Sequence, residues 1–266
     1  MKKTKDTDYL FLSSYLQAKM AHIDDRKPDK AAAFQEMQSM APDPQIVDFF
    51  RLKYDYHNAK VYLKSVAAGT SNEHLYVPLG RCTPAVLTEA CRTENYRSLP
   101  KTFADAVQSA SEVLGRTADP RLADFLLDKA YIREMRETAE KTGSGFLRGY
   151  ASLFADALNL RAVVRMLKSA VRPEQLPGVL TDCGSVTESR ILSAYPDAAA
   201  VLSLYRSTKL SPALPEAEKA AKGEGFSAFE KAVQAALNGY MDSAKTVCFG
   251  ENVLIRYLYQ MEGLHA

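Results

Sequence analysis

The chain has 266 residues, of which 47% are apolar and 25% are charged, and its formal net charge is +2. These values suit a folded chain with a sizeable core and exclude the strongly basic surface on which nucleic-acid binding depends. No apolar run approaches the roughly 18 residues of a membrane span, and no apolar stretch typical of a signal peptide follows the charged N-terminus.

Nearly every segment reads as helix, and proline, glycine or charged loops separate one helix from the next. Proline near a first turn marks helix starts at Pro44, Pro84 and Pro120. We expect loops at residues 24–30 and 69–84. The predicted helices cover 9–21, 31–40, 44–65, 84–92, 102–114, 120–141, 146–171, a short piece between 173 and 178, 187–194, short pieces between 196 and 215, 226–238 and 251–263.

Two-residue alternation of β-branched and aromatic residues is almost absent, so the sequence predicts an all-α fold without strands. The helix at residues 44–65 is long and amphipathic. Steps of three and four place seven of its residues on one stripe: Ile46, Phe49, Phe50, Lys53, Tyr54, His57 and Val61.

One pattern occurs twice, 101 positions apart: Asp, then Asn three residues on, then two bases at i, i+4 spacing. The matching residues are Asp55, Asn58, Lys60 and Lys64 in the first copy and Asp156, Asn159, Arg161 and Arg165 in the second. Weaker matches follow in the same order in both halves. They pair 83–90 with 187–194, 103–110 with 229–236, and 127–130 with 241–244. This order predicts a helical unit that was duplicated.

Residues i and i+3 share a helix face, so the Asp and Asn of each copy point together. We interpret them as structural: they can accept hydrogen bonds from N–H groups at a neighbouring helix end and fix how the lobes pack. A catalytic or metal site is the alternative, but the His and acidic partners of di-metal bundles are missing. The bases either form solvated faces or dock an acidic or helical partner.

Catalytic, cofactor and metal signatures are missing from the sequence, so we expect no catalytic residue, no cofactor and no metal ligand. His57 lies in the first repeat, but Leu158 replaces it in the second, which argues against a required histidine. The cysteines are expected to be reduced, buried or incidental thiols in a cytosolic protein, and the scattered histidines do not supply the ligands of a zinc site; these residues are Cys82, Cys91, Cys183, Cys248, His22, His57, His74 and His265.

Three stretches carry a resemblance to the C-subunit family of V-type and archaeal-type ATPases, whose vacuolar members are called d subunits. The segment 49–64 resembles that family's Tyr-Asp-x-x-Asn-x-Lys helix. Residues 127–131 and 156–165 are similar to its second signature, and 249–262 to its Phe-Gly-x-Glu, Tyr-Leu and Glu signature. Residues 9–12 and 16–19 resemble its first helix.

The resemblance implies a non-catalytic central-stalk subunit made of three similar helical lobes that form a funnel. Such a subunit lies on the cytoplasmic side of the membrane, peripheral to it. Its implied partners are the D- and F-type stalk subunits and the proteolipid c/K ring. It caps that ring and receives the foot of the shaft, which couples ATP synthesis or hydrolysis to proton or sodium translocation.

The chain departs from that family in two places. The family has a longer stretch before its Asp-x-x-Asn helix, whereas about two dozen residues separate Ala21 from Ile46 here. The family also continues into a third copy, whereas this chain stops at Ala266. We therefore expect a shortened first lobe at 1–45, a complete lobe at 46–145, and an incomplete second and third lobe at 146–266, through truncation or divergence.

Two other classes of protein remain open. A helical repeat adaptor that binds partner helices would stack its units into a superhelix rather than close a funnel. An all-α enzyme would gather titratable groups in a pocket, and the sequence offers no candidate set for one.

Overall fold

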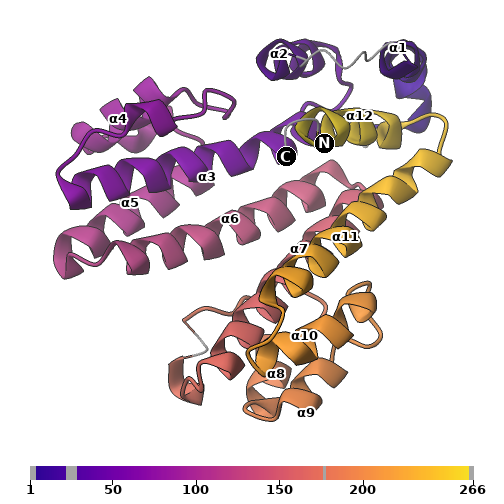
Figure 1. Cartoon of the computed structure of the whole chain (residues 1–266). Coiled ribbons are helices and arrows are strands. Elements are labelled where there is room, and N and C mark those ends of the chain that lie inside the picture. Colours follow the sequence, from indigo (N-terminus) through magenta and orange to yellow (C-terminus); the bar gives the residue numbers. More distant parts are fainter. Residues whose placement is uncertain (1–3, 22–28, 176–177, 264–266) are drawn as a thin grey trace. The chain divides into compact units, whose positions relative to one another are not determined.

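The computed structural model describes residues 4–21, 29–175 and 178–263 (Figure 1). Within these ranges it consists of helices and connecting turns without a strand, which confirms the predicted all-α class. Most of the predicted loop at 24–30 lies outside the described residues, as do His22, Pro177 and the chain end at 264–266. No helix in the described part is long and apolar enough to cross a membrane.

Contacts divide the chain into two compact units. Unit 1 comprises Met1–Gly143 and Val247–Ala266, and unit 2 comprises Ser144–Thr246. The helices of unit 1 are α1 (Leu10–Ala21), α2 (Lys30–Met40), α3 (Gln45–Ala68), α4 (Pro84–Arg92), α5 (Lys101–Thr117), α6 (Pro120–Thr142) and α12 (Glu251–Gly263), with 3-10 turns η1 (Asp6–Tyr9), η2 (Glu73–Leu75) and η3 (Tyr96–Ser98). The predicted repeat of lobes stays a prediction.

Local signals set the helix starts in unit 1. The side chain of Thr83 accepts a hydrogen bond from the N–H of Val86 at the start of α4. Asp119 caps α6 in the same way through the N–H of Arg121. Because these caps satisfy N–H groups that the helix itself cannot, both helices begin where the sequence predicts.

The core of unit 1 forms around α3, which packs mainly on α6, while α5 packs on α6 (Figure 1). The predicted single stripe on α3 is wrong in part. His57 is exposed, whereas Tyr56 and Ala59 are buried. The reason is that α3 contacts α4, α5 and α6 as well as α2 and α12, so it buries more than one face. The positions of the neighbouring helices, rather than the amphipathic pattern of α3 itself, determine which of its residues are buried.

A separate group of helices in unit 1 joins segments far apart in the sequence. The helix α12 packs on α1, α2 and α3. The N–H of Gly250 donates to the Oγ of Ser13, and Gln17 donates to the carbonyl of Cys248. The C-terminal helix therefore completes a group that begins with α1.

Unit 2 is continuous in sequence. Its elements are α7 (Gly145–Lys168), η4 (Pro173–Gln175), α8 (Glu188–Ala194), α9 (Ala198–Ser203), η5 (Ser211–Ala213), α10 (Leu214–Ala221), α11 (Phe226–Asp242) and η6 (Ser243–Thr246). The short piece predicted between 173 and 178 forms a 3-10 turn rather than an α-helix over its described residues. The core gathers side chains of α7, α10 and α11 around the fully buried Phe229 and Tyr205.

Ala118 should be replaceable by glycine with a gain in stability. It ends α5 with φ of 53°, in the left-handed region that disfavours a Cβ. We expect Ala118→Gly to raise the free energy of unfolding by about 0.5–1 kcal/mol, measured by urea denaturation. Gly69→Ala is the reverse control. Gly69 also has a positive φ, of 62°, and an added Cβ would meet no described atom within 4 Å, so alanine there should lower the free energy of unfolding through backbone strain alone. A higher free energy of unfolding for Gly69→Ala would contradict this explanation.

Candidate functional site

The first Asp–Asn pair lies on α3 and holds the loop at residues 77–82. Asn58 and Val77 exchange two hydrogen bonds: the side-chain Nδ2 donates to the carbonyl of Val77 at 2.9 Å, and the N–H of Val77 donates to Oδ1 at 2.9 Å. Asp55 accepts from the N–H of Cys82 at 3.3 Å. We call Asp55 and Asn58 the first clamp, because together they fasten both ends of this loop.

The second pair, on α7, repeats this geometry on the loop at residues 181–186. Asn159 and Thr181 exchange the same two bonds, at 2.8 and 3.0 Å. Asp156 accepts from the N–H of Val186 at 3.0 Å. We call Asp156 and Asn159 the second clamp. All four clamp side chains are at most 2% exposed.

Both clamps hold the chain just before a short helix. Cys82 precedes Thr83, the N-cap of α4, and Val186 precedes Thr187, the N-cap of α8. The clamped residues of the two loops lie 104 positions apart, whereas the clamps lie 101 apart. The second loop therefore lies three residues further from its clamp than the first, and both clamps still make the same backbone bonds.

Sequence reasoning missed two glycines at the centre of this geometry. A Cβ on Gly80 would overlap the Oδ1 of Asp55, and a Cβ on Gly184 would overlap the Oδ1 of Asp156. Neither glycine has a positive φ, so the requirement is for space rather than for an unusual backbone. The available signal was Gly-x-x-Thr at 80–83 and at 184–187, which keeps the 104-residue offset.

The two clamps differ at one position. Arg81 donates from Nε to the Oδ2 of Asp55 at 2.6 Å, whereas the Oγ of Ser185 fills the corresponding place on Asp156. Arg81 also donates from Nη1 to Glu134 of α6 at 2.7 Å. Glu134 accepts a further bond from the hydroxyl of Tyr56 at 2.8 Å. Only the first clamp therefore carries a buried ionic network.

Asp55 and Arg81 of this network have shifted pKa values, for different reasons. It raises the pKa of the Asp55 carboxyl, although the Arg81 guanidinium and the N–H of Cys82 favour the charged form. The pKa of Arg81 is raised because Glu134 and Asp55 outweigh its own desolvation. One guanidinium thus holds two carboxylates in the interior of unit 1.

The repeated bases form ion pairs within their own units. Lys60 and Lys64 pair with Asp128 and Asp124 of α6, at 2.5 and 2.7 Å. These pairs are partly exposed, and such pairs contribute little to stability.

In the second copy both bases converge on one carboxylate. Arg161 and Arg165 of α7 pair with Glu230 of α11, at 2.7 and 3.0 Å. By these ion pairs, α6 in unit 1 is the equivalent of α11 in unit 2. The sequence match instead pairs 103–110 on α5 with 229–236 on α11. The pairing of those two segments stays a prediction.

The described residues contain no group of three or more His, Cys, Asp or Glu that could hold a metal ion. Over the same part of the chain, the cysteines are free thiols. His57 lies against the carbonyl of Leu75 through its Nε2, at 3.0 Å. The structure brings the clamp residues together with loop backbone, and the repeated bases together with carboxylates of neighbouring helices.

Thiol reactivity should follow burial. Burial raises the pKa of both Cys82 and Cys91 to about 12, so little thiolate forms at neutral pH. Cys248 is exposed. We expect iodoacetamide at about pH 8 to label Cys248 in the folded protein, and Cys82 and Cys91 only after unfolding in urea, as read by peptide mass spectrometry. Fast labelling of Cys91 without denaturant would contradict this.

The fold and the clamps define an all-α protein in which a long helix fastens the loop that follows it, twice in one chain. The chain belongs to the ATP synthase (C/AC39) subunit family, whose model matches residues 29–263.

Curated relatives support the same family. The chain is 26% identical over 165 residues to the C subunit of the V-type sodium ATPase of Enterococcus hirae, an alignment that covers 62% of this chain and 50% of that protein. It is 24% identical over 134 residues to the C subunit of the V-type ATP synthase of Thermus thermophilus, which covers 49% of this chain and 42% of that protein. The chain thus spans about half the length of the curated relatives it matches.

Proposed function

We propose that this chain is a non-catalytic central-stalk subunit of a prokaryotic V-type or A-type ATPase or ATP synthase. The family match over residues 29–263 carries the proposal. In this role the subunit forms a socket between the rotating shaft and the proteolipid c/K ring, with D- and F-type stalk subunits as its other partners. It works at the cytoplasmic face of the membrane and helps to couple rotation to proton or sodium translocation.

The clamps support a structural role for the repeated residues. The side-chain amides of Asn58 and Asn159 each hydrogen-bond to the backbone of one loop residue. The carboxylates of Asp55 and Asp156 each accept a hydrogen bond from a backbone N–H. We propose that the clamps fix the shape of two successive helical lobes, at 46–145 and 146–266, behind a short first lobe at 1–45. The bases Lys60, Lys64, Arg161 and Arg165 then brace neighbouring helices of those lobes.

Co-purification tests the proposed function. The tagged chain, expressed with the neighbouring ATPase subunits of its own organism, should elute together with stalk subunits and the proteolipid ring. A chain that folds but elutes alone from cells containing the assembled ATPase would overturn the proposal.

Loss of one clamp amide should reduce stability in either unit. Asn58→Ala and Asn159→Ala each leave a part-buried loop N–H and C=O without their partner. We expect the free energy of unfolding to fall by about 2–4 kcal/mol, measured by urea denaturation, and assembly to fall with it. Asn95→Ala is the control: Asn95 caps η3 at an exposed site, so the loss should stay below about 1 kcal/mol. Equal losses would contradict the clamp.

A further inference from the structure

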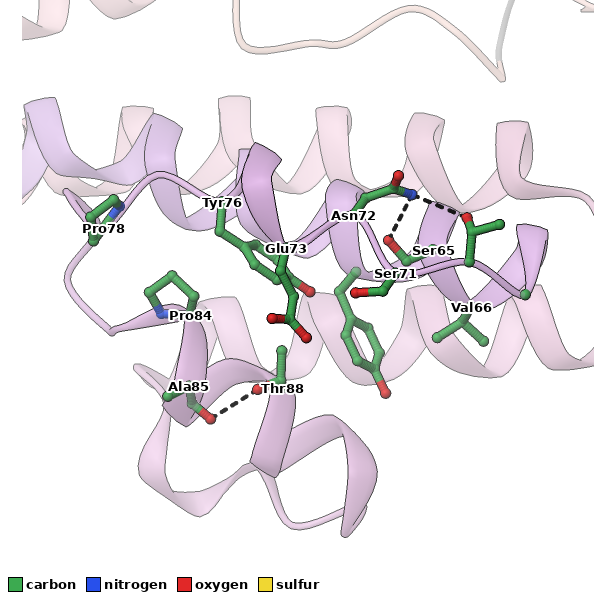
Figure 2. A pocket seen from close by; sticks show the side chains of 13 residues that line it. Ser65, Val66, Ser71, Asn72, Glu73, Tyr76, Pro78, Pro84, Ala85 and Thr88 are labelled. Carbon is green, nitrogen blue, oxygen red and sulfur yellow. Dashed lines mark hydrogen bonds between the residues drawn. The ribbon is translucent and has the colours of Figure 1, made fainter.

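A surface groove runs beside the C-terminal half of α3. Its volume is about 730 Å³, and Figure 2 shows the side chains that line it. Three segments form it: the end of α3 with Tyr62 and Val66, the loop at 69–78 with Glu73 and Tyr76, and the first turn of α4. Val66 is 55% exposed although it is aliphatic, so the groove presents an uncovered apolar side chain.

Hydrogen bonds hold part of the groove wall in place. Asn72 donates to the Oγ of Ser65 at 3.1 Å and to the Oγ1 of Thr70 at 3.3 Å (Figure 2). On the opposite wall the hydroxyl of Thr88 donates to the carbonyl of Ala85 at 3.1 Å. The loop is thereby tied to α3, and a preformed surface binds with a smaller loss of entropy.

A second hollow of about 310 Å³ adjoins the first, because both are lined by Tyr62 and Val66. It extends along α3 toward α5 and includes Tyr96 and Glu94. The joined groove thus contains three half-buried tyrosine rings, from Tyr62, Tyr76 and Tyr96. Tyrosine is enriched where proteins bind one another, and its ring face attracts cations.

The charge of the groove has one sign. Among the residues that line the two hollows, the charged ones are Glu73 and Glu94, and no basic side chain belongs to either lining. Both glutamates are exposed, and no ion pair to either is found within the described ranges. A ligand that complements this surface carries positive charge beside apolar side chains.

We propose that this groove is the docking site for a basic amphipathic helix of another subunit of the same ATPase, an inference that rests on the proposed function. A helix satisfies its own backbone hydrogen bonds, so it needs no backbone partner from the groove and can present apolar and basic side chains to it. Its apolar side chains cover Val66 and the tyrosine rings. Its Lys or Arg side chains reach Glu73 and Glu94.

Site-specific photo-crosslinking in the assembled ATPase tests the proposal. A benzophenone amino acid replaces Val66 in the full chain, which is co-expressed with the other ATPase subunits, purified as the complex and irradiated. We expect a crosslink to one subunit, in a peptide with apolar residues at steps of three and four and with Lys or Arg. Leu122 is the control position: it is an exposed aliphatic residue of α6 outside the groove, 45% exposed.

Charge removal provides the second arm. Glu73→Gln combined with Glu94→Gln should lower the crosslink yield at Val66 about tenfold at physiological salt and leave the thermal unfolding temperature unchanged. Glu224→Gln, at an exposed glutamate of unit 2, should leave the yield unchanged.

The outcomes are distinguishable. A crosslink from Val66 to an acidic segment, to lipid or to a second copy of this chain would overturn the assigned partner, and so would an assembled complex without any crosslink. If the wild-type chain fails to co-purify with the other subunits, the proposed function fails first, and the partner assigned here fails with it.

Discussion

Arg81→Met should lower the free energy of unfolding by about 3–5 kcal/mol, because it leaves two buried carboxylates without their shared counter-charge. Asp55 is 0% exposed and Glu134 is 4% exposed, so both carboxylates depend on buried partners for the stability of their charge. Methionine keeps much of the side-chain volume, so the loss reports charge rather than a cavity. Urea denaturation of the full chain measures it.

The pH dependence of this variant has a definite sign. Burial already raises the pKa of Asp55 in the folded protein, so the folded state binds that proton more tightly than the unfolded chain does. This contribution to stability is present at low pH and is lost as pH rises through the raised pKa. Without Arg81 the pKa of Asp55 should rise further, so more stability should be lost than in the wild type as pH rises above the ordinary carboxyl value.

Two further variants separate the effect of charge from the effect of packing. Arg81→Met combined with Glu134→Gln removes one of the stranded charges and should recover part of the stability. Ser185→Ala, at the matching place on the second clamp, removes one neutral donor from Asp156, which keeps the N–H of Val186. Its loss should be about 1–2 kcal/mol. Similar losses for Arg81→Met and Ser185→Ala would show that the ionic network adds nothing.

Gly80→Ala and Gly184→Ala should each destabilise the chain by about 3 kcal/mol, more than a single methyl group ordinarily does. In both cases the new Cβ would lie only 2.2 Å from an aspartate Oδ1. That carboxylate is held by its own hydrogen bonds, so either the loop or the clamp must give way. The two effects should be alike, because the geometry is the same in both copies.

Two other glycines provide the matched comparison. Gly115 on α5 and Gly239 on α11 have ordinary φ, and an added Cβ would meet no described atom within 4 Å. Alanine at either position should raise the free energy of unfolding by about 0.5–1 kcal/mol, since it restricts the unfolded chain and favours helix. The same substitution, glycine to alanine, thus has opposite signs at these two kinds of site. A stabilising Gly80→Ala would remove the case for a clamp.

Local chemistry explains what the sequence could predict. Helix starts at Pro84 and Pro120 and the break between the predicted helices 120–141 and 146–171 depend on groups within a few residues of each other. The predicted and observed bounds therefore agree closely there. The pairing of each Asp with an Asn on one helix face was also visible, because it depends on spacing alone.

Long-range partners explain what the sequence could not predict. Arg81 reaches Asp55 across 26 positions and Glu134 across 53, and no periodicity records such distances. The exposure of His57 depends on which helices surround α3. The importance of Gly80 appears only when a carboxylate from another element is placed beside it.

Unit 1 is made of two stretches separated by unit 2, and this affects the order in which the chain folds during synthesis on the ribosome. Unit 2 is one uninterrupted stretch, so its core can close as soon as α11 has emerged. The faces of α1, α2 and α3 that α12 covers are synthesised before unit 2, but their partner follows only after it. These faces therefore stay uncovered while the whole of unit 2 is made, and a chaperone that shields nascent chains would have much to do there.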